Sequence, residues 1–133
     1  MNIKDLVGYQ LADINANGII VKKGGKTFII KVNKTEDGSE CCDYNKIETS
    51  LFIDRKELFR NPIITNVEIC DNDKLVSNTA WGDGDAKTIT FFGENKVLAE
   101  FNSLSSSGSG WDYGATVKLV CKDLQIDEIV TTW

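Results

Sequence analysis

Alternating apolar and polar residues divide the chain into short segments of strand character. In residues 27–34, for example, Phe28, Ile30 and Val32 fall on one side of the alternation, with Ile29 on the other. A period of two is typical of a β-strand that buries one face. The same criterion, together with β-branched and aromatic content, predicts strands at residues 9–14, 19–21, 27–34, 41–49, 63–70, 88–92, 96–104, 115–122 and 124–132.

Turn sequences separate these segments. Asn17-Gly18 and Gly24-Gly25 suit tight hairpins because glycine tolerates positive φ, so the first 34 residues are predicted to form a three-stranded meander. Gly93-Glu94-Asn95 predicts a later hairpin. The pattern as a whole predicts a mainly β fold of about eight or nine antiparallel strands, arranged as a sandwich or an open barrel.

One short helix is predicted near residues 54–60. Asp54 is a suitable N-cap, Glu57 stands at capping-box spacing, and Pro62 prevents continuation. Residues 3–8 predict a single helical turn that is closed by a glycine.

Length and composition indicate one compact domain over residues 1–133. The 41% hydrophobic and 26% charged content is ordinary for a globular protein, and the chain has one proline. No apolar run approaches the roughly 20 residues that cross a bilayer, and the N-terminus lacks the apolar core of a secretory signal. We therefore expect a cytoplasmic protein that has no membrane partner.

Charge and composition narrow the classes of function. A net charge of −5 with only two arginines, Arg55 and Arg60, argues against binding of long nucleic acids, because affinity for phosphate backbones comes from Lys and Arg. A small anionic ligand needs only a few local donors and stays possible. The chain has no histidine, the commonest general base, and no recognisable catalytic motif. We expect neither an enzyme nor a cofactor.

Two clusters resemble metal sites only superficially. Cys41 and Cys42 are adjacent, whereas structural zinc uses spaced cysteine pairs, so packing is the favoured interpretation of these thiols. The predicted polar excursion at residues 71–85 contains Asp83-Gly84-Asp85 but lacks the ligand series of a calcium loop, which favours a solvated acidic loop. No metal site is predicted.

Aromatic residues in polar Ser/Gly loops are the preferred candidates for ligand binding. Large aromatic side chains offer rigid flat area, and serine hydroxyls with exposed N–H groups bind anions without basic side chains. A base would stack on Trp81, Trp111 and Tyr113, with Tyr44 approaching the same loop. The predicted phosphate donors are Ser105, Ser106, Ser107 and Ser109, together with Arg55 or Lys46. An equally consistent alternative folds the tryptophans back as lids over the sheet edges.

A second candidate anion site surrounds Gly24-Gly25, where Lys22, Lys23 and Lys26 can attract phosphate. Charged lysines at a hairpin tip are more often simply solvated. The sequence therefore favours a solvated tip here.

Several short motifs, in order, give the chain a resemblance to an uncharacterised family of small bacterial and phage proteins. The matching residues are Leu6-Val7-Gly8, Glu40-Cys41-Cys42 (with Glu where the family pattern has Asp), Asp54 to Phe59, Asn61-Pro62-Ile63, and Ser107 to Tyr113 leading into Ala115 to Cys121. The resemblance implies a phage or mobile-element origin and hence a place in the cytoplasm of a bacterial host. The resemblance implies no particular activity, because the family has no settled one.

The leading hypothesis is a non-enzymatic binding protein with pockets at a homo-oligomer interface. In a phage setting it would be a counter-defence sponge that sequesters a small, nucleotide-like immune signal. The alternative is a protein-interaction module that inhibits a host defence protein. A third hypothesis, a cysteine- or metal-dependent enzyme, has the least support.

Overall fold

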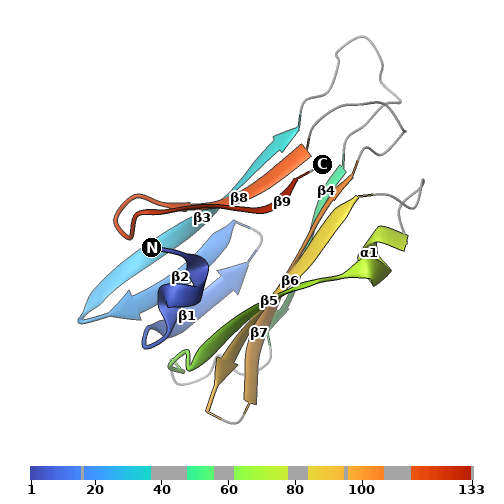
Figure 1. Cartoon of the computed structure of the whole chain (residues 1–133). Helices are drawn as coiled ribbons and strands as arrows, with labels where there is room; N and C mark the ends of the chain where they lie inside the picture. The colour runs from blue at the N-terminus through green and yellow to red at the C-terminus, as the bar shows by residue number, and fades with distance from the viewer. Residues whose placement is uncertain are drawn as a thin grey trace.

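The structure is a computed structural model that describes residues 1–15, 17–36, 48–55, 62–77, 84–94, 96–106 and 115–132. For residues 35–36, 48–55, 77, 106 and 115 it describes the backbone alone. The described residues form nine antiparallel strands in two sheets, which lie as two layers (Figure 1). The predicted mainly β class is confirmed.

The first sheet has five strands in the order β1-β2-β3-β8-β9. These strands are β1 (Gln10–Asn15), β2 (Gly18–Lys23), β3 (Lys26–Glu36), β8 (Ala115–Cys121) and β9 (Ile126–Thr132). Strands β1 to β3 form the predicted meander, in which the turn between β2 and β3 places Gly24 and Gly25 at φ +60° and +77°. Positive φ at both central residues is the geometry that this short hairpin requires.

The second sheet has four strands in the order β4-β7-β6-β5. These strands are β4 (Glu48–Arg55), β5 (Asn66–Asp71), β6 (Asp85–Gly93) and β7 (Lys96–Ser106). Strands β6 and β7 form the late hairpin that the sequence predicts around Gly93.

The inner faces of the two sheets share one hydrophobic core. Phe91 of β6 and Phe101 of β7 are fully buried, as are Val21, Ile30 and Leu119 of the five-stranded sheet. Alternation along each strand sends these side chains inward and their neighbours outward. The arrangement is therefore a sandwich rather than an open barrel.

The predicted N-terminal turn is present as the 3-10 helix η1 (Ile3–Leu6), and Gly8 follows it at φ +93°. Its apolar side chains are fully buried, and the Ile3 N–H donates to Glu128 Oε2 of β9 (3.0 Å). The N-terminus is thereby packed against the five-stranded sheet.

A short segment before β5 joins the two sheets through backbone hydrogen bonds. The Gly8 N–H donates to the Ile64 carbonyl (2.8 Å), the Ile64 N–H to Tyr9 (2.8 Å), and the Leu11 N–H to Pro62 (2.9 Å). The segment thus extends the β1 edge of one sheet and then continues into β5, the edge strand of the other.

The helix predicted near residues 54–60 does not begin at Asp54. Ile53, Asp54 and Arg55 are the last residues of β4, and they pair with β7 from Phe101 to Ala99. Pairing with a neighbouring strand outweighs the local capping signal, because propensity is only a weak preference. Residues 56–60 lie outside the described part of the chain.

A helix that the pattern did not predict, α1 (Asp73–Ser77), interrupts the polar stretch between β5 and β6. The Leu75 N–H donates to Asn72 Oδ1 (3.4 Å), so Asn72 occupies the capping position. Asn72 followed directly by Asp73 is a usable start signal, but too few apolar residues follow it to show a helical period.

Two buried glycines allow a test of how closely the strands pack. A Cβ on Gly18 would lie 2.5 Å from the Ile30 carbonyl oxygen, whereas a Cβ on Gly93 would meet the end of the Leu98 side chain at 2.7 Å. Backbone cannot move away as a side chain can, so Gly18→Ala should lower the free energy of unfolding by about 2–3 kcal/mol, and Gly93→Ala by about half as much. Urea unfolding measures both, and an equal or smaller effect at Gly18 would contradict the described register of β2 and β3.

Candidate functional site

Most residues of the predicted Ser/Gly-loop site lie outside the described part of the chain. These are Tyr44, Lys46, Trp81, Ser107, Ser109, Trp111 and Tyr113. Arg55 and Ser106 are described by their backbone only, and Ser105 is described in full.

The strand register separates two of the predicted phosphate-binding residues. Arg55 pairs with Ala99, while Thr49, six residues earlier in β4, pairs with Ser105. At about 3.3 Å per residue, this places Arg55 and Ser105 roughly 20 Å apart along the β4–β7 pair. The structure does not bring these two residues together.

The Ser105 hydroxyl forms a hydrogen bond inside the protein. Ser105 and Ser103 of β7 and Thr131 of β9 are all fully buried. Thr131 Oγ1 lies 2.8 Å from Ser105 Oγ and 2.7 Å from Ser103 Oγ, so one threonine joins two serines across the sheets. Buried hydroxyls need such partners, because an unsatisfied one costs free energy.

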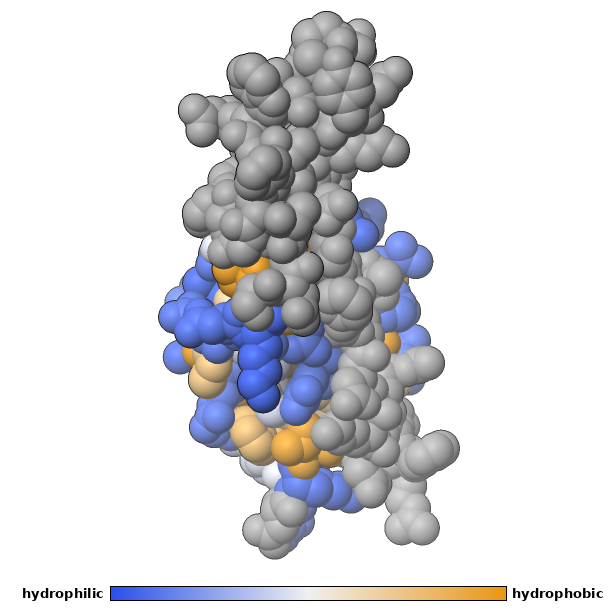
Figure 2. All heavy atoms as spheres, turned by 90° about the vertical axis from the view of Figure 1, so that its right-hand side faces the viewer, coloured by the Kyte–Doolittle hydropathy of each residue, from blue (hydrophilic) through white to orange (hydrophobic). Residues whose placement is uncertain are grey.

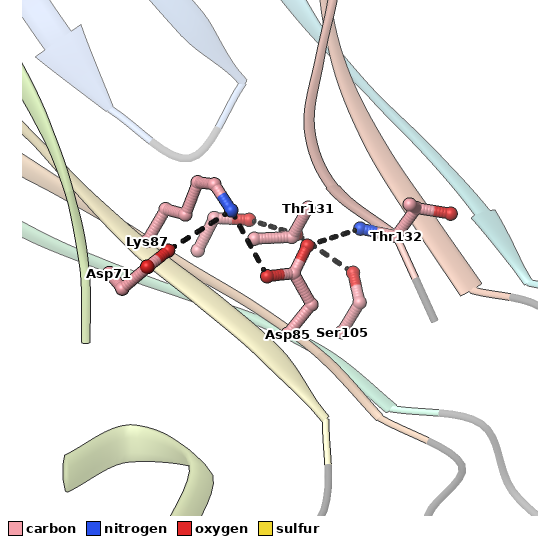
Figure 3. A network of polar contacts seen from close by, with 7 residues as sticks. Asp71, Asp85, Lys87, Ser105, Thr131 and Thr132 are labelled. Carbon is pink, nitrogen blue, oxygen red and sulfur yellow. Dashed lines mark hydrogen bonds and ion pairs between the residues drawn. The ribbon is translucent and has the colours of Figure 1, made fainter. Parts of the chain in front are cut away.

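Beside these hydroxyls, Lys87 points between two carboxylates (Figure 3). Its Nζ lies 3.2 Å from Asp85 Oδ1 and 3.3 Å from Asp71 Oδ1. Asp85 Oδ2 in turn accepts the N–H of Thr132 (2.9 Å). Strands β5, β6 and β9 are therefore connected through one chain of polar contacts.

Two opposing effects act on the pKa of Lys87. Partial burial by itself lowers the pKa, but hydrogen bonds and charge attraction from Asp85 and Asp71 outweigh it and raise the pKa above the ordinary 10.5. At neutral pH the amine is therefore protonated, and a protonated amine is neither a base nor a nucleophile. This polar cluster therefore connects the two sheets, and its lysine is held as a cation.

A pocket of about 450 Å³ lies beside the turn between β2 and β3, where the sequence analysis placed a second candidate anion site. Four of its residues form a row across neighbouring segments, because Ile63 pairs with Gln10, Gln10 with Lys22, and Lys22 with Thr27. Their strand neighbours Leu11, Val21 and Ile64 are buried, so the row belongs to the outer face of the sheet.

Lys23, Gly24 and Gly25 of the turn and Gly8 complete the lining of this pocket. A Cβ added at any of the three glycines would have no atom within 4 Å, so each leaves open space. Among the described residues the lining contains two lysines and no carboxylate. The pocket is thus locally basic in a chain whose net charge is −5.

An aromatic contact holds one of the two lysines. Lys23 Nζ lies 4.6 Å from the centre of the Tyr9 ring, and Tyr9 packs edge-on against Phe28 with ring centres 6.2 Å apart. Lysine above an aromatic face is a favourable cation–π arrangement. Tyr9 packs against the core, so the Lys23 ammonium is held over an inward-packed ring. Lys22, on the opposite strand face, is the lysine of the row and lies between Gln10 and Thr27.

The tip is exposed at Lys23, Gly24, Gly25 and Lys26, as the solvated-tip interpretation expects, and a pocket lies beside it. The Lys22-Lys23-Gly24-Gly25 motif was a visible signal for anion binding. The residues that turn the tip into a pocket are Gly8, Gln10 and Ile63. They come from distant parts of the chain, so local pattern could not place them.

No protein-family model, curated protein or solved structure matches the chain. Cys70 is exposed and Cys121 buried, both as free thiols, whereas Cys41 and Cys42 lie outside the described residues. In the part of the chain that the structure describes, no three His, Cys, Asp or Glu side chains are grouped as metal ligands. Neither of its short helices has the length and apolar character that spanning a membrane requires.

The buried hydroxyls predict a contrast between adjacent threonines. Thr131→Val removes the oxygen that joins Ser103 and Ser105, and should lower the free energy of unfolding by about 1–3 kcal/mol. Thr132→Val is the matched control, because its hydroxyl is exposed and bonded to Thr116 Oγ1 (3.0 Å). That change should cost about 0.5 kcal/mol or less. Equal losses in urea unfolding would contradict the bridging role of Thr131.

The raised pKa of Lys87 predicts a pH dependence. In the unfolded chain the amine loses its proton near 10.5, and in the folded protein it does so at higher pH. The stabilisation is therefore complete below pH 10.5 and is lost as pH rises through the folded pKa.

Lys87→Met should lower the free energy of unfolding by about 1 kcal/mol or less at pH about 8, and the deficit should shrink by pH about 11.5. Lys31→Met, at an exposed position of β3, serves as the control for replacing a lysine by methionine. A deficit at Lys87 that grows with pH would show that the amine is not held by the carboxylates.

Proposed function

We propose that the protein is a non-enzymatic binder of a small anionic ligand, and that the pocket beside the β2–β3 turn is its binding site. The observation that carries the proposal is the lining, which combines Lys22, Lys23 and the Gly24-Gly25 backbone with no carboxylate among the described residues. A basic lining attracts anions to this pocket even though the net charge of the chain is negative.

The donors of this pocket suit an anion. A lysine ammonium forms charge-assisted hydrogen bonds, which are about twice as strong as neutral ones. The β2–β3 register closes at the Lys23–Lys26 pair, so the N–H groups of Gly24 and Gly25 are not needed for strand pairing. Backbone N–H groups at such a turn are known anion donors.

The size of the pocket favours an organic anion. A volume of about 450 Å³ lies within the usual range for small-molecule sites. If the chain has the phage origin that its motifs led us to expect, the proposed role is a counter-defence sponge that sequesters a nucleotide-like immune signal in the host cytoplasm. In that proposal the protein acts by binding alone and needs no catalytic group.

The second candidate, a module that binds a host protein, is favoured by exposed apolar side chains. Ile29 and Ile129 of the five-stranded sheet are 54% and 56% exposed. Figure 2 shows the other side of the molecule, at the right of Figure 1, where the described apolar side chains of the part with the four-stranded sheet form small separate groups among hydrophilic ones. Scattered apolar residues are normal on a surface, so the basic pocket is the stronger support.

Calorimetric titration with cyclic dinucleotides, cyclic ADP-ribose isomers and mononucleotides tests the proposal. At least one ligand should bind, and Lys22→Glu should weaken that binding by about 10- to 100-fold, because it replaces a charge-assisted donor with a like charge. Lys31→Glu changes the net charge equally at an exposed position outside the pocket lining, and should bind as the unchanged protein does. Heat from none of these ligands, or equal losses for the two variants, would refute the anion site and leave the protein-binding candidate.

A further inference from the structure

The pocket has an apolar end and a cationic end. Ile63 is 53% exposed and lines the pocket at one end of the row, whereas Lys22 and the glycine turn lie toward the other. Neighbouring segments of a sheet are about 4.8 Å apart, and Gln10 lies between the two, so the Ile63 and Lys22 backbones are roughly 10 Å apart. An inorganic anion would use only the cationic end.

The middle of the row is an amide. Gln10 pairs with Lys22 on one side and with Ile63 on the other. A glutamine side chain offers two donors and an acceptor, which suits hydroxyl groups or the edge of a base. The order along the row is therefore cation, amide and apolar surface.

From this order we infer that the pocket takes a nucleoside phosphate, with the phosphate at Lys22 and the Gly24-Gly25 turn and the flat base against Ile63 and Gly8. The sugar or the base edge then lies beside Gln10. The open space at Gly8, where a Cβ would meet nothing within 4 Å, gives a flat group access to this end. The inference rests on the proposed anion site and adds which part of the pocket binds the phosphate, the sugar and the base.

A matched pair of variants isolates the apolar end. Ile63→Thr keeps a β-branched side chain and the backbone bridge to Gln10, and it replaces the ethyl group on Cβ with a hydroxyl. Ile29→Thr makes the same change at an equally exposed isoleucine, 54% against 53%, that does not line this pocket. Thermal unfolding of both variants confirms that they fold.

Titrations of the full chain with AMP, adenosine, phenyl phosphate and inorganic phosphate test the inference. AMP should bind at least about tenfold more tightly than each of the other three, since each lacks at least one of the recognised parts. Ile63→Thr should weaken AMP binding about five- to tenfold and leave phosphate binding unchanged, whereas Ile29→Thr should change neither.

The outcomes distinguish a failure of the nucleoside phosphate assignment from a failure of the proposed anion site. Equal binding of AMP and inorganic phosphate, equal binding of AMP and phenyl phosphate, or an Ile63→Thr variant that loses both AMP and phosphate overturns the nucleoside assignment while anion binding stands. Absence of binding by all four compounds overturns the inference; if the cyclic nucleotides also fail to bind, the anion site fails with it.

Discussion

The three backbone hydrogen bonds between residues 8–11 and residues 62–64 are the constraint on which the rest of the structure depends. They attach the chain to the edge of one sheet just before it enters the edge of the other, so the two layers are fixed relative to each other at this point. They also set the side-chain alternation of the segment. Ile64 enters the core, and Ile63 faces the pocket. The backbone pairing of residues 8–11 with residues 62–64 therefore supports both the fold and the candidate site.

The opposite end of the inter-sheet space is held by polar rather than apolar contacts. Along β6 and β7 the inward side chains change from Phe91 and Phe101 to Lys87 and Ser103. Hydrophobic contact is non-directional, whereas hydrogen bonds fix distance and orientation. The apolar part therefore supplies most of the cohesion, and the polar part fixes the position of β9 against β6 and β7.

Much of the fold could be predicted from the sequence, because period-two alternation and glycine turns are local signals. They identified the first meander and the late hairpin with boundaries close to those observed. The predictions were wrong where a distant partner decides the conformation. Asp54 carries a capping signal, yet its backbone pairs with Glu100 of β7. The site was less predictable for the same reason, since Gln10 and Ile63 meet Lys22 only after the sheets have formed.

Because Ile63 and its neighbour Ile64 point to opposite faces, the pocket and the core can diverge separately during evolution. Hydrogen bonds to the backbone hold this segment in place, and they do not depend on the side chain at position 63. A substitution there changes the pocket lining without creating a cavity beneath it. Under the proposed function, related proteins with the same scaffold would acquire different ligand preferences by single substitutions at this one surface position.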